Sequence, residues 1–181
     1  AAVLVGGSGM YGAAENREPW FLSALESLRT VLRAELPMFA SCWGIQALAT
    51  ALGGRVEVRP NWSEFGTIRV ELFPGASGDV LFGELPEELW VQAGHSESVT
   101  ALPPGALCLA GSERCPHQAF TLPGRPVYAC QFHPELSHED LQYRVRRYSL
   151  QLGLESDWSD PHSSRRSEIG LLLLRRFVER C

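Results

Sequence analysis

The sequence predicts an α/β fold, in which a central, mostly parallel β-sheet is flanked by helices. The first third of the chain alternates short apolar runs, typical of buried strands, with segments whose leucines recur every three or four residues, typical of helices. Glycine-rich segments follow the first strand and the second helix, where the chain has to turn. Strands that alternate with helices in this way form parallel sheets with helices packed on their faces.

Each predicted element follows from a local pattern. Pro19 suits the first turn of a helix, and Pro37 cannot continue one, so the leucine-rich segment between them is bounded at both ends. In the middle of the chain, polar and apolar residues alternate as in half-exposed strands. We expect strands at 2–5, 38–40, 55–59, 67–72, 89–93, 106–110, 118–122 and 127–132, helices at 19–35, 43–52, from 137 onward and at 169–178, and a loop at 156–166.

Composition excludes several classes of function. The 181 residues are 45% hydrophobic and 20% charged, as expected for one globular domain spanning 1–181. All 16 basic residues are arginine, so chemistry that needs a lysine, such as a Schiff base or a P-loop, is excluded. A net charge of −5 without a basic run argues against nucleic-acid binding. No apolar stretch is long enough to span a bilayer, so we expect no membrane partner.

The cysteines indicate a reduced protein. There are five of them, an odd number with irregular spacing and no Cys-x-x-Cys pair, which argues against a disulfide framework and against a zinc site. We therefore expect a cytoplasmic protein without a metal or cofactor. Four of them, Cys108, Cys115, Cys130 and Cys181, are expected to be unreactive.

Cys42 is the candidate nucleophile. It lies between a predicted strand and a predicted helix in Ala40-Ser41-Cys42-Trp43-Gly44-Ile45-Gln46. A tight strand-to-helix turn exposes the central side chain above the sheet, as in a nucleophile elbow. The helix N-terminus also stabilises a thiolate, which is the reactive form of cysteine. The alternative is a buried cysteine that packs as a small hydrophobic residue.

A second segment supplies a candidate base. The predicted strand at 127–132 leads into His133-Pro134-Glu135. A cysteine nucleophile needs a base for its proton, and the base needs a third group that fixes its orientation. His133 and Glu135 lie two residues apart at a strand end, so both can face the same way. A lone His-x-Glu is weak evidence, and its combination with the cysteine elbow is what makes the pattern specific.

These motifs resemble those of the class I (triad) glutamine amidotransferases. Residues 42–46 match the family's Cys-x-Gly-x-Gln, residues 131–135 match its Gln-Phe-His-Pro-Glu, and residues 6–9 resemble its Gly-Gly-Pro-Gly loop with Ser8 in place of proline. Residues 95–99, 102–106 and 118–120 are similar to blocks of the GMP-synthase-like group. The resemblance covers residues 2 to about 150, leaves 151–181 as a C-terminal helical extension, and implies a flavodoxin-like sheet.

The resemblance implies a role for each matched residue. Cys42 would attack the side-chain amide of L-glutamine and form a γ-glutamyl thioester, with His133 as general acid and base and Glu135 as its orienting partner. The backbone N–H groups of Gly7 and Trp43 would bind the oxyanion. The implied substrate-binding residues are Gln46, Gly94, His95, Ser96 and Glu97.

The sequence departs from the family pattern in two informative places. Glu97 stands where the family has an aspartate one methylene shorter. The family's fold also has a strand, a helix and another strand before the glycine-rich loop, whereas the printed sequence begins almost at this loop. We expect the full protein to contain these elements.

Three functions remain open from the sequence. The first is a glutaminase that releases ammonia to a separate synthase partner, because no ATP-binding motif with a lysine is present. The second is a free-standing γ-glutamyl hydrolase that acts on γ-glutamyl amide or amine conjugates. The third is an inactive homologue with a regulatory or scaffold role, against which the intact Cys42, His133 and Glu135 argue.

Overall fold

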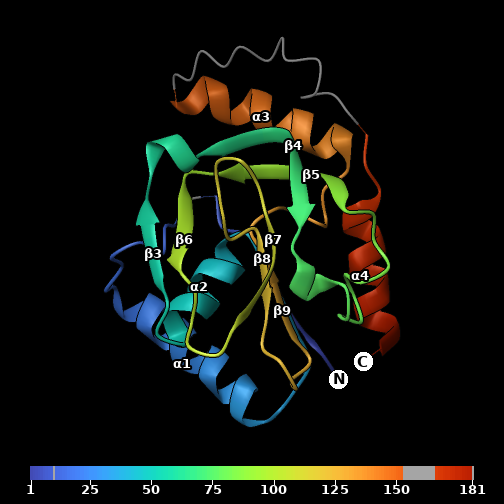
Figure 1. Cartoon of the computed structure of the whole chain (residues 1–181). Coiled ribbons are helices and arrows are strands. Elements are labelled where there is room, and N and C mark those ends of the chain that lie inside the picture. The colour runs from blue at the N-terminus through green and yellow to red at the C-terminus, as the bar shows by residue number, and fades with distance from the viewer. Residues whose placement is uncertain (10, 153–165, 181) are drawn as a thin grey trace.

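The computed structural model describes residues 1–9, 11–152 and 166–180 (Figure 1). The predicted loop at 156–166 falls almost wholly outside these residues, as does Cys181. The elements are β1 (Val3–Val5), α1 (Pro19–Arg33), β2 (Met38–Ser41), α2 (Trp43–Ala51), β3 (Arg55–Val58), β4 (Glu64–Leu72), β5 (Glu88–His95), β6 (Glu97–Ala101), β7 (Leu107–Gly111), β8 (Ala119–Thr121), β9 (Val127–Cys130), α3 (His138–Leu152) and α4 (Ile169–Arg180).

The predicted α/β class is confirmed, with a sheet that is mixed. Among the described residues, seven strands form one sheet in the order β1-β2-β9-β8-β7-β4-β5. β1, β2 and β9 pair in parallel, with Val5 opposite Ala40 and Ser41 opposite Cys130. The remaining four ladders, from β9 through β8, β7 and β4 to β5, are antiparallel. The carboxyl ends of β1, β2 and β9 therefore meet at one edge, where α/β folds usually place their sites.

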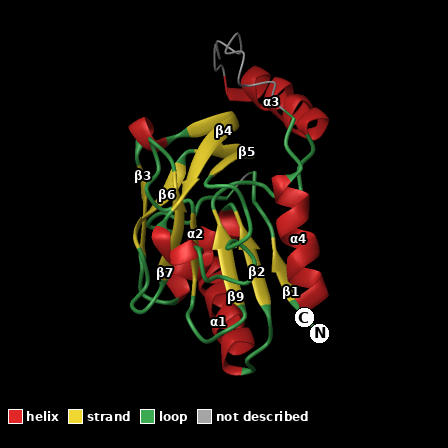
Figure 2. Cartoon of the chain, turned by 45° about the vertical axis from the view of Figure 1, so that its right-hand side comes forward, coloured by secondary structure: helices red, strands yellow, loops and turns green. Residues whose placement is uncertain are grey.

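Two hydrophobic clusters hold helices on opposite faces of this sheet. On β2, Met38 and Ala40 belong to the cluster that contains α1 and α2, while Phe39 belongs to the cluster that contains Leu173 and Phe177 of α4. This division follows from the alternation of side chains along a strand. On α1 the buried residues Phe21, Leu25, Leu28 and Leu32 form one stripe. The leucine spacing predicts Leu22 on this face, but Leu22 is exposed and Phe21 takes its place. In Figure 2, α4 runs beside the strands and α3 lies at one end of the molecule, near β4.

The prediction missed one strand, β6. β6 pairs with β3 in a separate two-stranded antiparallel sheet, in which Val56 lies opposite Val99. β5 and β6 are separated by Ser96 alone, so the chain reverses beside the predicted substrate-binding segment. β4 also begins at Glu64, three residues earlier than predicted, and β5 extends to His95.

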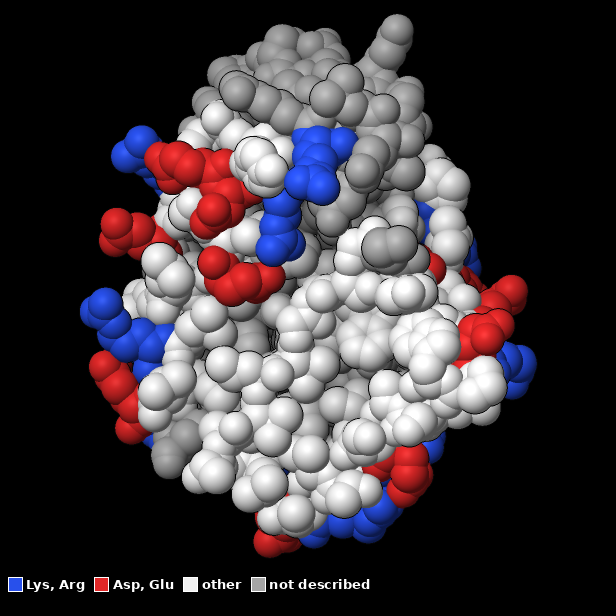
Figure 3. All heavy atoms as spheres, turned by 180° about the vertical axis from the view of Figure 1, so that it is seen from behind, with Lys and Arg blue, Asp and Glu red and all other residues white. Residues whose placement is uncertain are grey.

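The surface shown in Figure 3 carries uncharged residues across its centre, with charges of both signs above the centre and at the left, right and lower edges. None of the helices among the described residues has the length and apolar composition that crossing a membrane requires.

Candidate active site

Cys42 occupies a strained turn between β2 and α2. Its backbone has φ 53° and ψ −108°, so a residue with a side chain adopts a positive φ, which is uncommon outside glycine. It is the N-cap residue of α2, and its N–H donates to the carbonyl oxygen of Cys130 at 2.9 Å. Only 7% of Cys42 is exposed. This is the geometry predicted for a nucleophile elbow, and it places the thiol at the N-terminus of a helix.

His133 and Glu135 form a pair next to this thiol. The Nδ1 atom of His133 lies 2.7 Å from Oε1 of Glu135, and the same ring interacts with Cys42. The His133 N–H donates to the carbonyl of Gln92 on β5 at 2.7 Å, which fixes the backbone of the histidine. Ser41 directs its hydroxyl to the second carboxylate oxygen of Glu135, at 3.4 Å. Sequence reasoning missed both contacts, because Ser41 and Gln92 are brought to the pair only by the fold.

Electrostatics favour a protonated His133. Burial of the ring opposes its charge, but hydrogen bonds to Cys42 and Glu135 outweigh this and raise the pKa of His133 to about 9. Glu135 shows the complementary shift: partial burial raises its pKa, but the hydrogen bond to His133 and the positive charges of His133 and Arg144 lower it overall. An ionised carboxylate therefore faces a histidine that holds its proton, and such a pair can donate a proton to a leaving group.

The loop after β1 lies directly against these two groups. A Cβ atom added to Gly7 would lie 2.8 Å from Cε1 of His133 and 3.3 Å from Cβ of Cys42. Only a residue without a side chain allows the backbone to approach so closely. Gly44, in the first turn of α2, is equally tight, because a Cβ there would lie 2.5 Å from the carbonyl oxygen of Val5. These contacts place the end of β1 against the start of α2, and the loop after β1 against Cys42 and His133.

The end of β5 closes the site from the other side. In hydrogen-bonding order β5 is five strands from β2, which is about 24 Å in a flat sheet. Nevertheless, the carbonyl oxygen of Gly94 lies 3.9 Å from Sγ of Cys42, so the sheet curls back on itself. A Cβ added to Gly94 would be 4.0 Å from Nε2 of His133. Gly94 thus lies beside the Cys42 thiol and the His133 ring. Two residues later, Ser96 is exposed at the turn.

The other predicted substrate-binding side chains make contacts within the protein. Gln46 is buried, and its amide nitrogen donates to the carbonyl of Glu97 at 2.8 Å and to Oε1 of Gln131 at 3.3 Å. The carboxylate of Glu97 accepts the N–H groups of Ala13 and Ala14. The direct contacts of these residues with a substrate stay predictions.

His95 lies behind the site in a buried polar cluster. Its Nε2 is 3.2 Å from Oε2 of Glu64, and its Nδ1 is 3.1 Å from the carbonyl of Glu97. Glu64, His95 and Cys115 also bring their possible ligand atoms within 4.8 Å of one another, so they are a group of described residues that could hold a metal ion. The oxygens of Glu64, however, already accept hydrogen bonds from Ser112 and Gln118. These contacts make the cluster a hydrogen-bonded part of the core.

The other described cysteines lie in environments that favour the neutral thiol. Burial raises the pKa of Cys108, raises that of Cys115 to about 11 and raises that of Cys130 well above its usual value. A neutral thiol is a poor nucleophile. These environments agree with the expectation that the three cysteines are unreactive.

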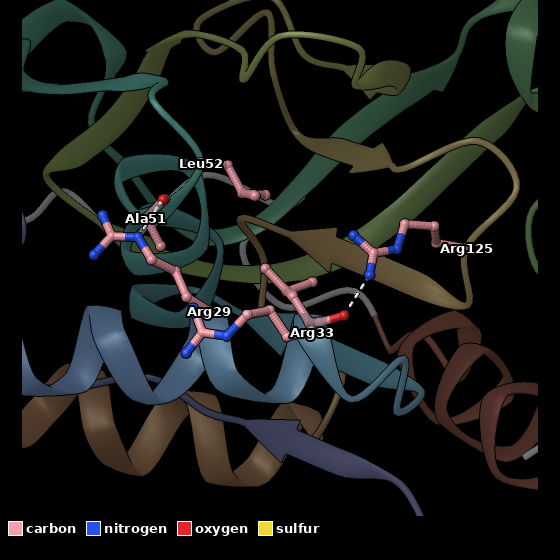
Figure 4. Close-up of a pocket in the computed structure, with 6 residues that line it drawn as sticks. Arg29, Arg33, Ala51, Leu52 and Arg125 are labelled. Carbon is pink, nitrogen blue, oxygen red and sulfur yellow. Dashed lines mark hydrogen bonds between the residues drawn. The ribbon is translucent and has the colours of Figure 1, made fainter.

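A hollow lies at the end of α2 opposite Cys42 and is lined partly by arginines (Figure 4). Arg29 donates to the carbonyl of Ala51, the last residue of α2, and Arg125 donates to the carbonyl of Leu32 near the end of α1. Carbonyls at helix C-termini lack partners within the helix, so these arginines act as caps. The hollow is remote from Cys42, which begins α2.

The chain matches the family described as "Glutamine amidotransferase class-I" over residues 2–149. The chain belongs to this family. A GMP synthase [glutamine-hydrolyzing] from Thermus thermophilus is 37% identical to it over 128 residues, which is 70% of this chain and 24% of that protein. A GMP synthase [glutamine-hydrolyzing] from Porphyromonas gingivalis is 30% identical over 156 residues, or 84% of this chain and 30% of that protein. The chain thus spans about a quarter of the length of these curated relatives.

Solved structures show the same fold. A glutamine amidotransferase from Thermotoga maritima superposes with a TM-score of 0.78 and 26% identity over 98% of this chain and 76% of that chain. A putative GMP synthase subunit from Thermoplasma acidophilum gives a TM-score of 0.68 and 25% identity over 97% of this chain and 70% of that chain. These findings confirm the predicted family and its GMP-synthase-like character.

Proposed function

We propose that this chain hydrolyses the side-chain amide of L-glutamine. One observation carries the proposal: Cys42, His133 and Glu135, together with the backbone of Gly7 and Gly94, converge from four separate segments of the chain at the carboxyl edge of the parallel strands. Cysteine, histidine and carboxylate in this order are the components of nucleophilic acyl transfer. Family membership supports the same reaction.

The reaction proceeds in two steps. His133 takes the proton of the Cys42 thiol, and the sulfur attacks the amide carbon. The N–H groups of Gly7 and Trp43 stabilise the negative charge on the former carbonyl oxygen. His133 gives its proton to the leaving nitrogen, so that ammonia departs and a γ-glutamyl thioester remains. His133 then takes a proton from the water molecule that attacks the thioester, and it gives this proton to the Cys42 sulfur as the C–S bond breaks and glutamate leaves. Glu135 keeps the imidazole in the tautomer and orientation that both transfers need.

Substrate binding is assigned to the segment that closes the site. Gly94 lies beside the reactive atoms, and we propose that the turn through Ser96 binds the α-amino and carboxylate groups of glutamine. Contacts of Glu97 support this turn. Its carbonyl accepts a hydrogen bond from Gln46 and lies close to the ring of His95, and its carboxylate accepts the N–H of Ala13.

The ammonia acceptor is assigned to another part of the protein or to a partner. Curated relatives are named GMP synthase [glutamine-hydrolyzing], and the matched region is 24% of one of them; a solved neighbour is called a putative GMP synthase subunit. These names support a synthase as the acceptor. This chain contains no lysine, so a P-loop for an ATP-dependent step would have to lie elsewhere.

Steady-state kinetics with two substrate classes test the proposal. Ammonia and glutamate release from L-glutamine is compared with amine release from γ-glutamyl amine conjugates, with the wild type and Cys42→Ala measured in parallel. We expect glutamine turnover that Cys42→Ala abolishes and Cys108→Ala, a matched control, retains. Turnover of the conjugates alone would favour the γ-glutamyl hydrolase. No turnover of either substrate, with and without a synthase, would favour the inactive homologue.

A further inference from the structure

The carboxylate of Glu97 is attached to the loop that follows β1. Its Oε2 atom accepts two backbone N–H groups, from Ala13 at 2.6 Å and from Ala14 at 2.9 Å. Gly12 packs against the other oxygen so closely that a Cβ there would collide with Oε1. Hydrogen bonds to an ionised acceptor are stronger than neutral ones. The loop is thus fastened to the start of β6, which is distant from it in the sequence.

The backbone of the same residue joins two further elements. The Glu97 carbonyl accepts a hydrogen bond from the side chain of Gln46 on α2 at 2.8 Å and lies 3.1 Å from Nδ1 of His95 on β5. Glu97 therefore connects the loop that contains Gly7, the helix that begins after Cys42 and the strand that contains Gly94. These three elements surround the reactive sulfur.

We propose that Glu97 is a positioning residue, which holds residues 12–14 after β1 so that the Gly7 N–H faces the oxyanion. It does not bind the substrate ammonium group. One carboxylate oxygen accepts two N–H groups from the loop and Gly12 packs against the other, so the carboxylate is directed at the loop. The proposal rests on the glutaminase function proposed above. A loop displaced by about 1 Å costs on the order of a hundredfold in rate.

The substitutions Glu97→Ala and Glu97→Gln separate positioning from substrate binding. The Glu97→Gln side chain keeps a carbonyl oxygen that can accept the two N–H groups but carries no charge, whereas Glu97→Ala removes the acceptor oxygen as well as the charge. A positioning role predicts that Glu97→Ala lowers kcat by about tenfold to a hundredfold with little change in KM, and that Glu97→Gln restores most of kcat. An ammonium-binding role predicts that both variants raise KM equally, and this result would overturn the proposal. Glu15→Gln, which neutralises an exposed carboxylate next to this loop, is the control.

Gly12→Ala tests the same contact by changing the loop instead of the carboxylate. The new methyl group would collide with Oε1 of Glu97 and displace the carboxylate, so we expect the kcat loss of Glu97→Ala. When Gly12→Ala is combined with Glu97→Ala the collision is absent, so we expect the second substitution to add little to the loss in kcat. Fully additive losses would contradict the shared mechanism.

Amide hydrogen exchange tests the contact without any activity measurement. We expect the N–H groups of Ala13 and Ala14 to be protected in the wild type and in Glu97→Gln, and to exchange faster in Glu97→Ala. Unchanged exchange in Glu97→Ala would refute the positioning role even if glutamine is hydrolysed. Conversely, faster exchange in a protein that does not hydrolyse glutamine would support the contact and reject the proposed function.

Discussion

Gly6 and Gly7 are adjacent glycines with very different surroundings, and alanine substitutions exploit this difference. At Gly7 a Cβ would lie 2.8 Å from Cε1 of His133, whereas ordinary carbon–carbon contacts are about 3.5–4.0 Å. The loop or the imidazole must therefore move by about 1 Å. A misplacement of this size costs roughly a hundredfold in rate, similar to the loss of one oxyanion donor. At Gly6 a Cβ would meet nothing within 4 Å.

The assay is kcat/KM for glutamine hydrolysis, with thermal unfolding as a check on folding. We expect Gly7→Ala to lose about a hundredfold in kcat/KM, while Gly6→Ala stays close to the wild type. Neither glycine has a positive φ, so alanine introduces no backbone strain at either position. Wild-type activity in Gly7→Ala, or equal losses in both variants, would refute the placement of the Gly7 backbone against the reactive groups.

Two further substitutions test the triad and the elbow. Glu135→Gln removes the negative partner of His133 and lowers the pKa of this histidine from about 9, so the upper limb of the pH dependence of kcat/KM moves to lower pH; an unmoved limb would contradict the pairing. Folding raises the His133 pKa above its ordinary 6.5, so protonation of His133 stabilises the fold fully below pH 6.5. This stabilisation is lost as the pH rises through about 9. In urea unfolding, we expect the loss of stability between these pH values to be smaller for Glu135→Gln than for the wild type. Gly44→Ala places a Cβ 2.5 Å from the Val5 carbonyl and should lower the free energy of unfolding by about 1–3 kcal/mol; unchanged stability would show that α2 does not pack on β1 this tightly.

Local patterns were sufficient to predict the elements that carry the reactive groups. The leucine spacing and the flanking prolines define α1, and the apolar run before Cys42 defines β2. The elbow followed from a cysteine between a strand and a helix, because few other arrangements place a side chain at the edge of a parallel sheet. The pairing of His133 with Glu135 followed from their spacing at a strand end.

Contacts between distant segments could not be predicted in this way. The curl that returns Gly94 to Cys42 depends on four antiparallel ladders, whose order is not encoded in any one strand. β6 is short and polar at its start, so its pattern resembled a loop. The attachment of Glu97 to Ala13 and Ala14 requires knowledge of where the loop and the β5–β6 turn meet. Sequence reasoning therefore named Glu97 by motif position and missed its partners.

Chemical labelling of the cysteines tests the central claim most directly. The protein is incubated with a glutamine-analogue affinity label and digested, and the modified peptide is identified by mass spectrometry, with excess glutamine as competitor. Because Cys42 alone among the described cysteines lies beside His133 at a helix N-terminus, we predict one label per chain, on Cys42, and protection by glutamine. Modification of Cys108, Cys115 or Cys130 instead, or labelling that glutamine does not prevent, would contradict the account.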